Sequence, residues 1–507
     1  MRNNKELKMG VILSYLNLFI GNLIPFIYTP IMLRILGQAE YGLYSIANSV
    51  IGYLSLLSFG MGSTIVRYVT KYRVENDKEK EEGIIGLFFI IYIVLAILVF
   101  FGGYYLANYS DVIFQQGLTL QEISKIKILI YIMTFNTAIS FPISVFTSIT
   151  IAHEKYIFRK LIDMISTIMV PVSNIIVLYL GFGSIGMAFT GTILQFCILP
   201  INGIYCLKKI HIKPSFKHVP FNFLKEILGF SMFIFLDSMV DILFWSTDKI
   251  ILGSLIGTVA TAVYSVGGTF SNMMQNLSVA ISSILVPRIT EMVLTNNNKS
   301  LWTKMFIQIG RIQFYIIALV LSGFVVFGYY FIGFIAGSGY ESSYIIALLT
   351  MVPLSVPLIQ NTGYNILVAQ NKHRFRAVVY FIIAILNVIS TYLIVPYLGG
   401  IGAALCSSIA YFIGQVVIMN IYYYRVIGID IPLFWKSIFN MSKIPLLMIC
   451  VSVVLLKFID MSNVINFMLG VIAFTITYLL LSYKFNMNDY EKELTNNILN
   501  KVMLKLR

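Results

Sequence analysis

The chain has 507 residues, of which 58% are hydrophobic and 11% are charged. A soluble protein of this size cannot remove so much apolar surface from water, so the composition excludes a soluble globular protein and predicts a polytopic membrane protein. The formal net charge is +14. Because the basic residues follow a membrane topology, this charge requires no nucleic acid as a partner.

Apolar segments long enough to cross a bilayer follow one another along the chain, because a spanning helix needs only about 20 residues. The first begins after Arg2, Lys5 and Lys8 and is too long for a cleaved signal peptide. We therefore predict an all-α polytopic fold with about 14 transmembrane helices. Their expected ranges are 10–35, 42–66, 83–108, 126–150, 161–180, 184–206, 228–247, 255–286, 305–335, 343–368, 377–397, 400–424, 443–459 and 464–483.

The loops between these helices alternate in charge. With this arrangement, one side of the membrane carries 31 of the 36 Lys and Arg residues. The positive-inside rule makes that side cytoplasmic and places both termini there. The basic loops are also expected to attract the anionic head groups of membrane lipids. The five exceptions are Arg34, Lys125, Lys127, Lys249 and Lys457.

The sequence contains an internal repeat. An Ala-x-x-Lys-x-x-Phe-Arg motif begins at Ala152 and again at Ala369, on predicted inner loops. A Tyr-Leu-Gly motif begins at Tyr179 and again at Tyr397, on predicted outer turns. An earlier pair of matches keeps the order and a similar offset of about 215 to 221 residues: Ile35-Leu36-Gly37, Tyr44-Ser45 and Arg67 against Ile251-Leu252-Gly253, Tyr264-Ser265 and Arg288.

Corresponding elements of the repeat lie six predicted helices apart. Because six is even, both copies enter the membrane in the same direction, which is the parallel class of repeat found in two-lobed transporters. We predict a six-helix lobe over residues 1–220, a second over 221–440, two extra transmembrane helices over 441–484 and a cytoplasmic tail over 485–507. The tail suits either a short amphipathic helix on the membrane surface or a disordered segment.

Three aspartates lie in or beside the seventh predicted helix. At 100° per residue, Asp237, Asp241 and Asp248 fall within about 40° of one another. A carboxylate facing lipid is unfavourable, so this face is expected to line a water-filled cavity or to meet a cation. The functional interpretation is a site for a coupling H⁺ or Na⁺ ion, or a gate formed with an arginine. The structural alternative is an ion pair within the bundle, or for Asp248 a place at the outer interface beside Lys249.

Three arginines are the candidate ligands of a phosphate-bearing substrate, because the guanidinium fork suits phosphate. Arg67 and Arg288 occupy equivalent inner ends of the two predicted lobes, and Arg34 lies near the outer end of the first helix. The alternative for Arg67 and Arg288 is ordinary anchoring at the inner interface. The sequence contains no metal-ligand spacing and no ATP-binding loop, so no cofactor is predicted apart from a coupling ion.

A family resemblance rests on two stretches. One runs from Pro30 to Tyr44 and continues with Phe59-Gly60 and Arg67-Tyr68; the other runs from Asp248 to Gly253 and continues with Tyr264-Ser265 and Pro287-Arg288. Both resemble Wzx-type polysaccharide flippases, which belong to the multidrug/oligosaccharidyl-lipid/polysaccharide exporter superfamily. The resemblance extends through length, helix number and paired lobes over nearly the whole chain.

This resemblance implies transport of a polyprenyl-diphosphate-linked oligosaccharide, with undecaprenyl as the lipid, from the inner to the outer leaflet of a bacterial or archaeal cytoplasmic membrane. Alternating access of a partly cationic cavity is the implied mechanism, and glycosyltransferases and a polysaccharide polymerase are the implied partners. Lipid II flippases share this plan but usually have more arginine in the first two helices than Arg34 and Arg67 supply. That departure favours a capsule, O-antigen or teichoic-type repeat unit.

Two other functions compete with this one. A drug or cation antiporter of the same superfamily would use the acidic face of the seventh helix, but the cationic balance of the candidate cavity residues argues against it. A membrane polysaccharide polymerase or ligase typically carries a long outer loop with arginine and histidine, and no predicted outer loop here has that size or chemistry. We therefore expect a transporter rather than an enzyme.

Overall fold

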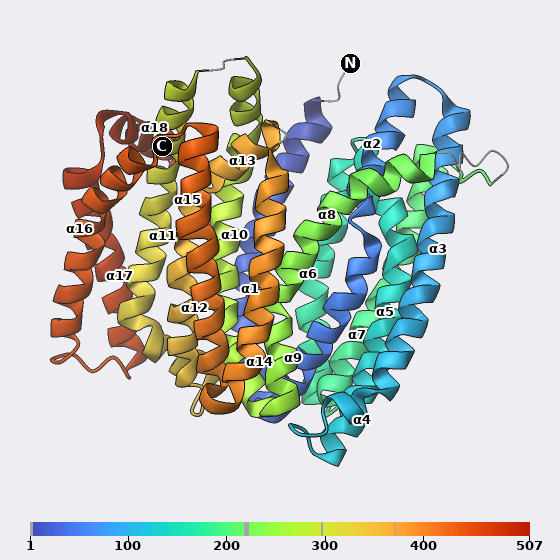
Figure 1. The fold of residues 1–507 in the computed structure, drawn as a ribbon, viewed down its shortest axis with the longest axis horizontal. Coiled ribbons are helices and arrows are strands. Elements are labelled where there is room, and N and C mark those ends of the chain that lie inside the picture. The colour runs from blue at the N-terminus through green and yellow to red at the C-terminus, as the bar shows by residue number, and fades with distance from the viewer. Residues whose placement is uncertain (1–3, 217–222, 296–297, 371, 507) are drawn as a thin grey trace. The chain divides into compact units, whose positions relative to one another are not determined.

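The computed structural model describes residues 4–216, 223–295, 298–370 and 372–506, which form helices and no strands (Figure 1). The α-helices are α1 (Asn4–Ser55), α2 (Met61–Val74), α3 (Lys78–Asn108), α4 (Ser110–Ile113), α5 (Leu120–Ala152), α6 (Tyr156–Tyr179), α7 (Gly183–Tyr205), α8 (Leu224–Trp245), α9 (Thr247–Leu255), α10 (Thr258–Thr295), α11 (Lys299–Ala336), α12 (Ser342–Ile359), α13 (Asn361–Ala369), α14 (His373–Tyr411), α15 (Met419–Tyr422), α16 (Ile431–Leu455), α17 (Val464–Leu481) and α18 (Asp489–Leu506). The shorter turns are the 3₁₀ turn η1 (Leu56–Ser58) and the π-helical turns η2 (Cys206–Ile210), η4 (Phe412–Ile418), η5 (Tyr423–Ile427) and η6 (Ser482–Asn486).

Ten segments of the described chain are long and apolar enough to cross a membrane. Two of them, Ile12–Val74 and Arg374–Ile427, have 63 and 54 residues, which is room for two crossings each. The first breaks at Gly37 and the second at Gly399. Both glycines have positive φ, as does Gly181, which is the counterpart of Gly399 in the first copy of the repeat. Glycine adopts this conformation without strain. With 14 long helices among the described residues, the predicted all-α, multi-pass fold is confirmed.

The chain divides into two compact units, of which the first contains Met1–Ser265 and Ala384–Ala403. Within it, α3 packs along α5, α1 along α6, and α5 along α7, as Figure 1 shows in blue to green. Buried side chains such as Phe88, Tyr92 and Ile126 fill the core of this unit. The packing brings α1 against α9. The part of α1 that follows Gly37 is called its second leg.

The second unit contains Val266–Ile383 and Ala404–Arg507. The long helix α11 packs against α12, α16 and α17, which surround it in Figure 1. Phe327, Phe474 and Tyr478 belong to the buried core between α11 and the last two membrane helices. The lobe boundaries expected at residues 220 and 440 remain predictions.

Polar residues just outside the apolar runs determine where several helices begin. Thr119 and Glu122 form a reciprocal capping box at the start of α5. The carboxylates of Asp77 and Asp430 each accept a backbone N–H of the helix that follows, at 3.1 and 2.9 Å. Such caps satisfy N–H groups that the first turn of a helix leaves without partners. The C-terminal tail is also helical, as α18, and its place on the membrane surface remains a prediction.

The two copies of the sequence repeat have the same local geometry. Phe158 stacks on Tyr205 with ring centroids 3.6 Å apart and planes inclined by 4°. In the second copy Phe375 stacks on Tyr422, at 4.2 Å and 11°. Each residue of the second pair follows its counterpart by 217 positions. The duplication read from the sequence is therefore present as a repeated packing arrangement.

Both copies also end in the same way. The π turn η2 of the first copy and the π turn η5 of the second begin at Cys206 and Tyr423, again 217 positions apart. Each is followed by one residue in the left-handed conformation, His211 with φ 58° and Gly428 with φ 83°. The backbone of this segment is thus preserved although the side chains differ.

Candidate functional site

The seventh predicted helix, expected over 228–247, corresponds to α8 and ends in the structure at Trp245. Ser246 (φ −106°, ψ −34°) separates α8 from α9. Asp237 and Asp241 lie one turn apart on α8, where Asp237 is half-buried and Asp241 is exposed. Asp248 belongs to α9, so the acidic face expected over three turns does not extend along one helix to that residue. In the described part of the chain, no group of three His, Cys, Asp or Glu side chains is placed to hold a metal ion.

Asp248 is fully buried and is held by a hydrogen bond from another helix. The hydroxyl of Tyr264, on α10, donates to its carboxylate at 2.5 Å. The preceding residue, Thr247, is hydrogen-bonded through its hydroxyl to the hydroxyl of Tyr53 on the second leg of α1. Polar groups from α1, α9 and α10 therefore meet inside the first unit. The sequence indicated Tyr264 only as a member of the repeat, and it gave no signal for Tyr53.

The residues around η1 fix α8 against the start of α2. Phe59 stacks on Phe235 with ring centroids 4.7 Å apart. Gly60 has φ 61°, and a Cβ atom there would lie 2.2 Å from a side chain of α8, so only glycine fits this close approach. Further along, the buried hydroxyls of Thr64 and Ser231 are hydrogen-bonded at 3.0 Å. This contact holds in place the helix that carries Asp237 and Asp241.

The three candidate arginines come from different helices. Arg34, on α1 just before the break at Gly37, and Arg67, on α2, are both exposed. Arg288 is on α10, and its side chain lies outside the described residues. The phosphate-binding roles of all three stay predictions.

Glu40 is a functional candidate that sequence reasoning missed. It forms an ion pair with Lys125 and accepts a hydrogen bond from the hydroxyl of Ser184 at 2.5 Å. It thereby connects the second leg of α1 to the starts of α5 and α7. The available signal was Lys125 itself, because a basic residue that departs from the charge pattern is expected to have an acidic partner.

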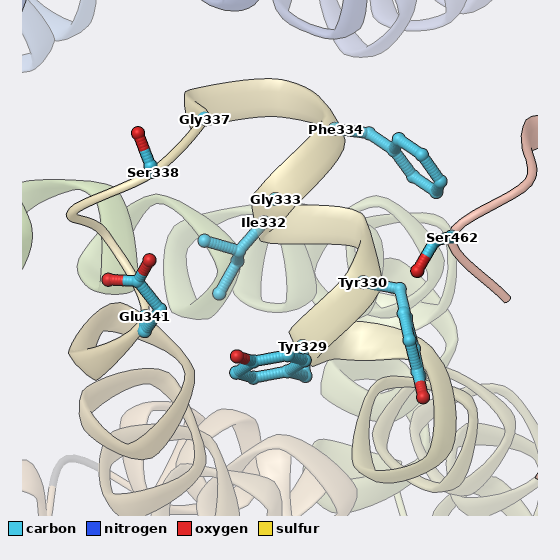
Figure 2. A pocket seen from close by; sticks show the side chains of 9 residues that line it. All are labelled: Tyr329, Tyr330, Ile332, Gly333, Phe334, Gly337, Ser338, Glu341 and Ser462. Carbon is cyan, nitrogen blue, oxygen red and sulfur yellow. The ribbon is translucent and has the colours of Figure 1, made fainter.

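Figure 2 shows a cavity of about 290 Å³ in the second unit. Tyr329, Tyr330 and Phe334 of α11 supply aromatic walls, and Glu341 lies on the opposite side from Tyr330 and Phe334. The backbone N–H of Gly339 donates to the Glu341 carboxylate at 3.0 Å. This hydrogen bond holds the pKa of that carboxyl below its usual value, because it stabilises the charged form. The cavity therefore combines aromatic faces with one anionic group.

A second cavity, of about 680 Å³, lies near the start of α11. The Nε and Nη2 atoms of Arg311 donate to Glu491 of α18 at 2.5 and 2.8 Å. This pair is well buried, with 13% of the arginine and 4% of the glutamate side chain exposed, so it fastens the tail helix to the bundle. The charged and polar residues that line the cavity include Lys299, Lys304, Arg311, Asp430 and Asn488.

Solved transporter structures share this fold. A lipid II flippase MurJ in an inward closed conformation is 18% identical, with a TM-score of 0.74 over 94% of this chain and 98% of that one. An inward-facing multidrug resistance MATE family transporter of the MOP superfamily is 14% identical, with a TM-score of 0.64 over 82% and 96%. The Vibrio cholerae MATE transporter VcmN in its bent form is 13% identical, with a TM-score of 0.55 over 85% and 99%.

At these identities the likeness establishes the fold alone, and it confirms the superfamily fold predicted from the sequence. No curated protein matches the chain. The family comparison is more specific, because it rests on the sequence itself. Residues 7–293, more than half of the chain, match the family described as polysaccharide biosynthesis protein, and the chain belongs to that family.

Proposed function

We propose that the protein moves undecaprenyl-diphosphate-linked oligosaccharide repeat units from the inner to the outer leaflet of the cytoplasmic membrane. The units would serve the synthesis of a capsule, O-antigen or teichoic-type surface polymer. The match of residues 7–293 to the polysaccharide biosynthesis family carries this proposal. The fold shared with a lipid II flippase over 94% of the chain supports it.

In this proposal the protein works by alternating access, with both termini in the cytoplasm. The exposed Arg67 side chain and Arg288 receive the lipid diphosphate, since arginine binds phosphate oxygens in a bidentate manner. Arg34, on α1 just before the break at Gly37, is a further contact of the diphosphate. Asp237 and Asp241 bind the H⁺ or Na⁺ ion whose gradient drives the cycle. Glycosyltransferases supply the substrate, and a polymerase consumes it on the outer side.

The first test measures lipid-linked sugar in cells that lack the gene and carry it back on a plasmid. Deletion should cause lipid-linked oligosaccharide to accumulate in the inner leaflet and should remove surface polysaccharide. The double variant Arg67→Ala/Arg288→Ala should fail to restore the polymer at a normal protein level. Lys71→Ala is the matched control, because Lys71 is an exposed cation one turn further along α2. A normal amount of surface polysaccharide in the double variant would contradict the proposal that these two arginines bind the phosphate groups of the substrate.

The second test examines ion coupling in proteoliposomes. Asp237→Asn and Asp241→Asn should each abolish the acceleration that an imposed Na⁺ or H⁺ gradient gives to substrate movement, because the amide cannot carry the charge that binds the ion. Asp111→Asn, on the exposed short helix α4, is the control. Gradient-driven transport that persists in both α8 variants would contradict the coupling assignment.

The fold is also shared with multidrug transporters of the MATE family, so drug or cation antiport is a second candidate. The deletion strain separates the two functions. Antiport predicts greater sensitivity to cationic drugs with unchanged surface polysaccharide, whereas the flippase predicts the loss of polysaccharide.

A further inference from the structure

Arg159 and Arg376 occupy the same place in the two copies of the repeat, but they have different partners. In the first copy Arg159 forms a salt bridge with Asp163 at 2.7 Å and donates a hydrogen bond to Thr147 at 3.2 Å. Both partners lie close by in the chain, one on α5 and the other on α6. The charge of this arginine is therefore neutralised by a carboxylate of the same copy.

In the second copy tyrosines replace those partners. The guanidinium of Arg376 lies over the ring of Tyr364 at 4.4 Å and over the ring of Tyr380 at 4.5 Å from the centroids. These two tyrosines follow Thr147 and Asp163 by 217 positions each. A third exchange accompanies them, because Tyr423, which lies near the Arg376 charge, stands where the first copy has Cys206.

The exchange leaves a positive charge without an acidic partner. Arg376 is half-buried, and within the described part of the chain no carboxylate forms an ion pair with it. Removing a cation from water is unfavourable unless a counter-charge or a hydrogen-bond acceptor replaces the water. Two aromatic faces offset part of that cost, but they provide no counter-ion.

The surroundings supply further groups that bind anions. Tyr380 is 7% exposed, and its hydroxyl makes no hydrogen bond of normal geometry among the described atoms, although it lies close to the Arg376 charge. Arg376 is also in the first turn of the 39-residue helix α14, where free N–H groups and the helix dipole favour a negative charge. Lys372 and Arg374 lie beside it with exposed side chains.

The walls of this place are built by close packing. Tyr423 is 3% exposed, and its ring touches Phe306 edge to face with centroids 5.9 Å apart. A Cβ atom at Gly363, on α13, would lie 2.7 Å from the Tyr423 ring. Glycine at this position therefore gives the ring its room, and the tyrosines are held rigidly around the guanidinium.

We propose that Arg376, Tyr364, Tyr380 and Tyr423 form a binding site for a phosphate or diphosphate group of a membrane lipid. The guanidinium supplies the charge and a fork of N–H donors, and the Tyr380 hydroxyl donates an additional hydrogen bond to a phosphate oxygen. The first copy does not bind phosphate in this proposal, because Asp163 already neutralises the charge of Arg159. The site goes beyond the proposed function, since it depends neither on Arg67 nor on translocation.

The test uses purified full-length protein in an uncharged detergent, with inorganic pyrophosphate as the probe and calorimetry as the readout. Tyr380→Phe keeps the ring over the guanidinium and removes the hydroxyl, so it should weaken binding by about tenfold, which is the loss of one charge-assisted hydrogen bond. Tyr380→Asp copies the first repeat, gives Arg376 an internal partner and should abolish binding when the measurement is made in the Arg67→Ala/Arg288→Ala background, which removes the other proposed phosphate ligands. Tyr380→Phe should unfold at the parent temperature, whereas Tyr380→Asp, which removes a buried ring, should unfold at a lower one.

The control variant is Arg159→Gln, which removes the equivalent arginine of the first copy and should leave pyrophosphate binding unchanged. An equal affinity in the parent, Tyr380→Phe and Tyr380→Asp proteins would overturn the site. Binding that Arg159→Gln removes and Tyr380→Asp keeps would also overturn it. A purely structural role for Arg376 predicts that stability changes and that pyrophosphate binding does not depend on Tyr380.

The lipid that supplies the phosphate is identified in nanodiscs of neutral lipid. Undecaprenyl diphosphate and phosphatidylglycerol are added separately, and protection of Arg376 from a guanidinium-modifying reagent is measured. Protection by either lipid that is lost in Tyr380→Asp supports the site and identifies the lipid that supplies the phosphate. Protection by neither lipid overturns the site. Protection by phosphatidylglycerol alone leaves the flippase proposal intact, because that proposal is tested by the accumulation of lipid-linked sugar.

Discussion

Tyr264 and Asp248 are joined by a hydrogen bond of 2.5 Å between α10 and α9. The carboxylate is fully buried, so the bond replaces water that the carboxylate would otherwise keep. We expect Tyr264→Phe to destabilise the protein by about 1.5–3 kcal/mol, the range for a hydrogen bond to a charged group. Thermal unfolding in detergent measures this effect. Tyr397→Phe, at a tyrosine that is 86% exposed, should leave the unfolding temperature unchanged.

The contact between Gly42 and α10 predicts the effect of a single methyl group. A Cβ atom at Gly42 would lie 2.0 Å from the carbonyl oxygen of Thr258, and a backbone atom cannot move aside as a side-chain end can. Gly42→Ala should therefore cost about 1–3 kcal/mol or more by overpacking. At Gly268 a Cβ atom meets nothing within 4 Å, so Gly268→Ala should be neutral or stabilise α10 by up to about 1 kcal/mol. An unchanged unfolding temperature for Gly42→Ala would contradict this packing.

The ion pair of Arg311 and Glu491 predicts that the tail is released when one partner is removed. Because both side chains are buried, Glu491→Gln should cost about 3–5 kcal/mol by leaving a charge without its partner. Replacing both partners by methionine should recover much of that loss. Proteolysis at Lys492 reports release of α18. Glu493→Gln, at an exposed position of the same helix, serves as the comparison and should leave the tail protected.

The hydrogen bond from Gly339 to Glu341 predicts a pH dependence of the turn between α11 and α12. The pKa of Glu341 is lowered in the folded state, so its contribution is present above the unfolded pKa and is lost as the pH falls through the folded one. Hydrogen exchange of the segment around Gly339 should be faster in Glu341→Gln than in the parent at neutral pH. The difference should vanish in acid. A difference that persists at low pH would assign the protection to another contact.

Much of the fold follows from apolar runs and charge alternation, but the separate short helix α9 does not. The seventh helix ends at Trp245, two residues before its predicted end, and a separate helix α9 begins at Thr247. There the contacts of Thr247 with Tyr53 and of Asp248 with Tyr264 come from distant segments. The sequence carries no local signal for these tertiary hydrogen bonds. The Gly37 and Gly399 breaks were easier to expect, since glycine tolerates positive φ.

The candidate site was harder to read than the fold. Charge in an apolar run indicated Asp237 and Asp248, yet nothing local distinguished the half-buried residue from the buried one. The repeat was recognised from identical residues, so it indicated Arg159 and Arg376 as equivalents. It gave no signal that Asp163 has become Tyr380, because a search for identities overlooks the positions at which two copies differ.

The π turns separate what the two copies share from what they do not. A π turn is rare and usually interrupts an α-helix for a single turn, yet η2 and η5 lie at matching positions of the two copies. The counterpart of η4 in the first copy is the regular helix α7. The two halves therefore have the same backbone at the predicted cytoplasmic end of this helix pair and different backbones one turn earlier, so they are not interchangeable there.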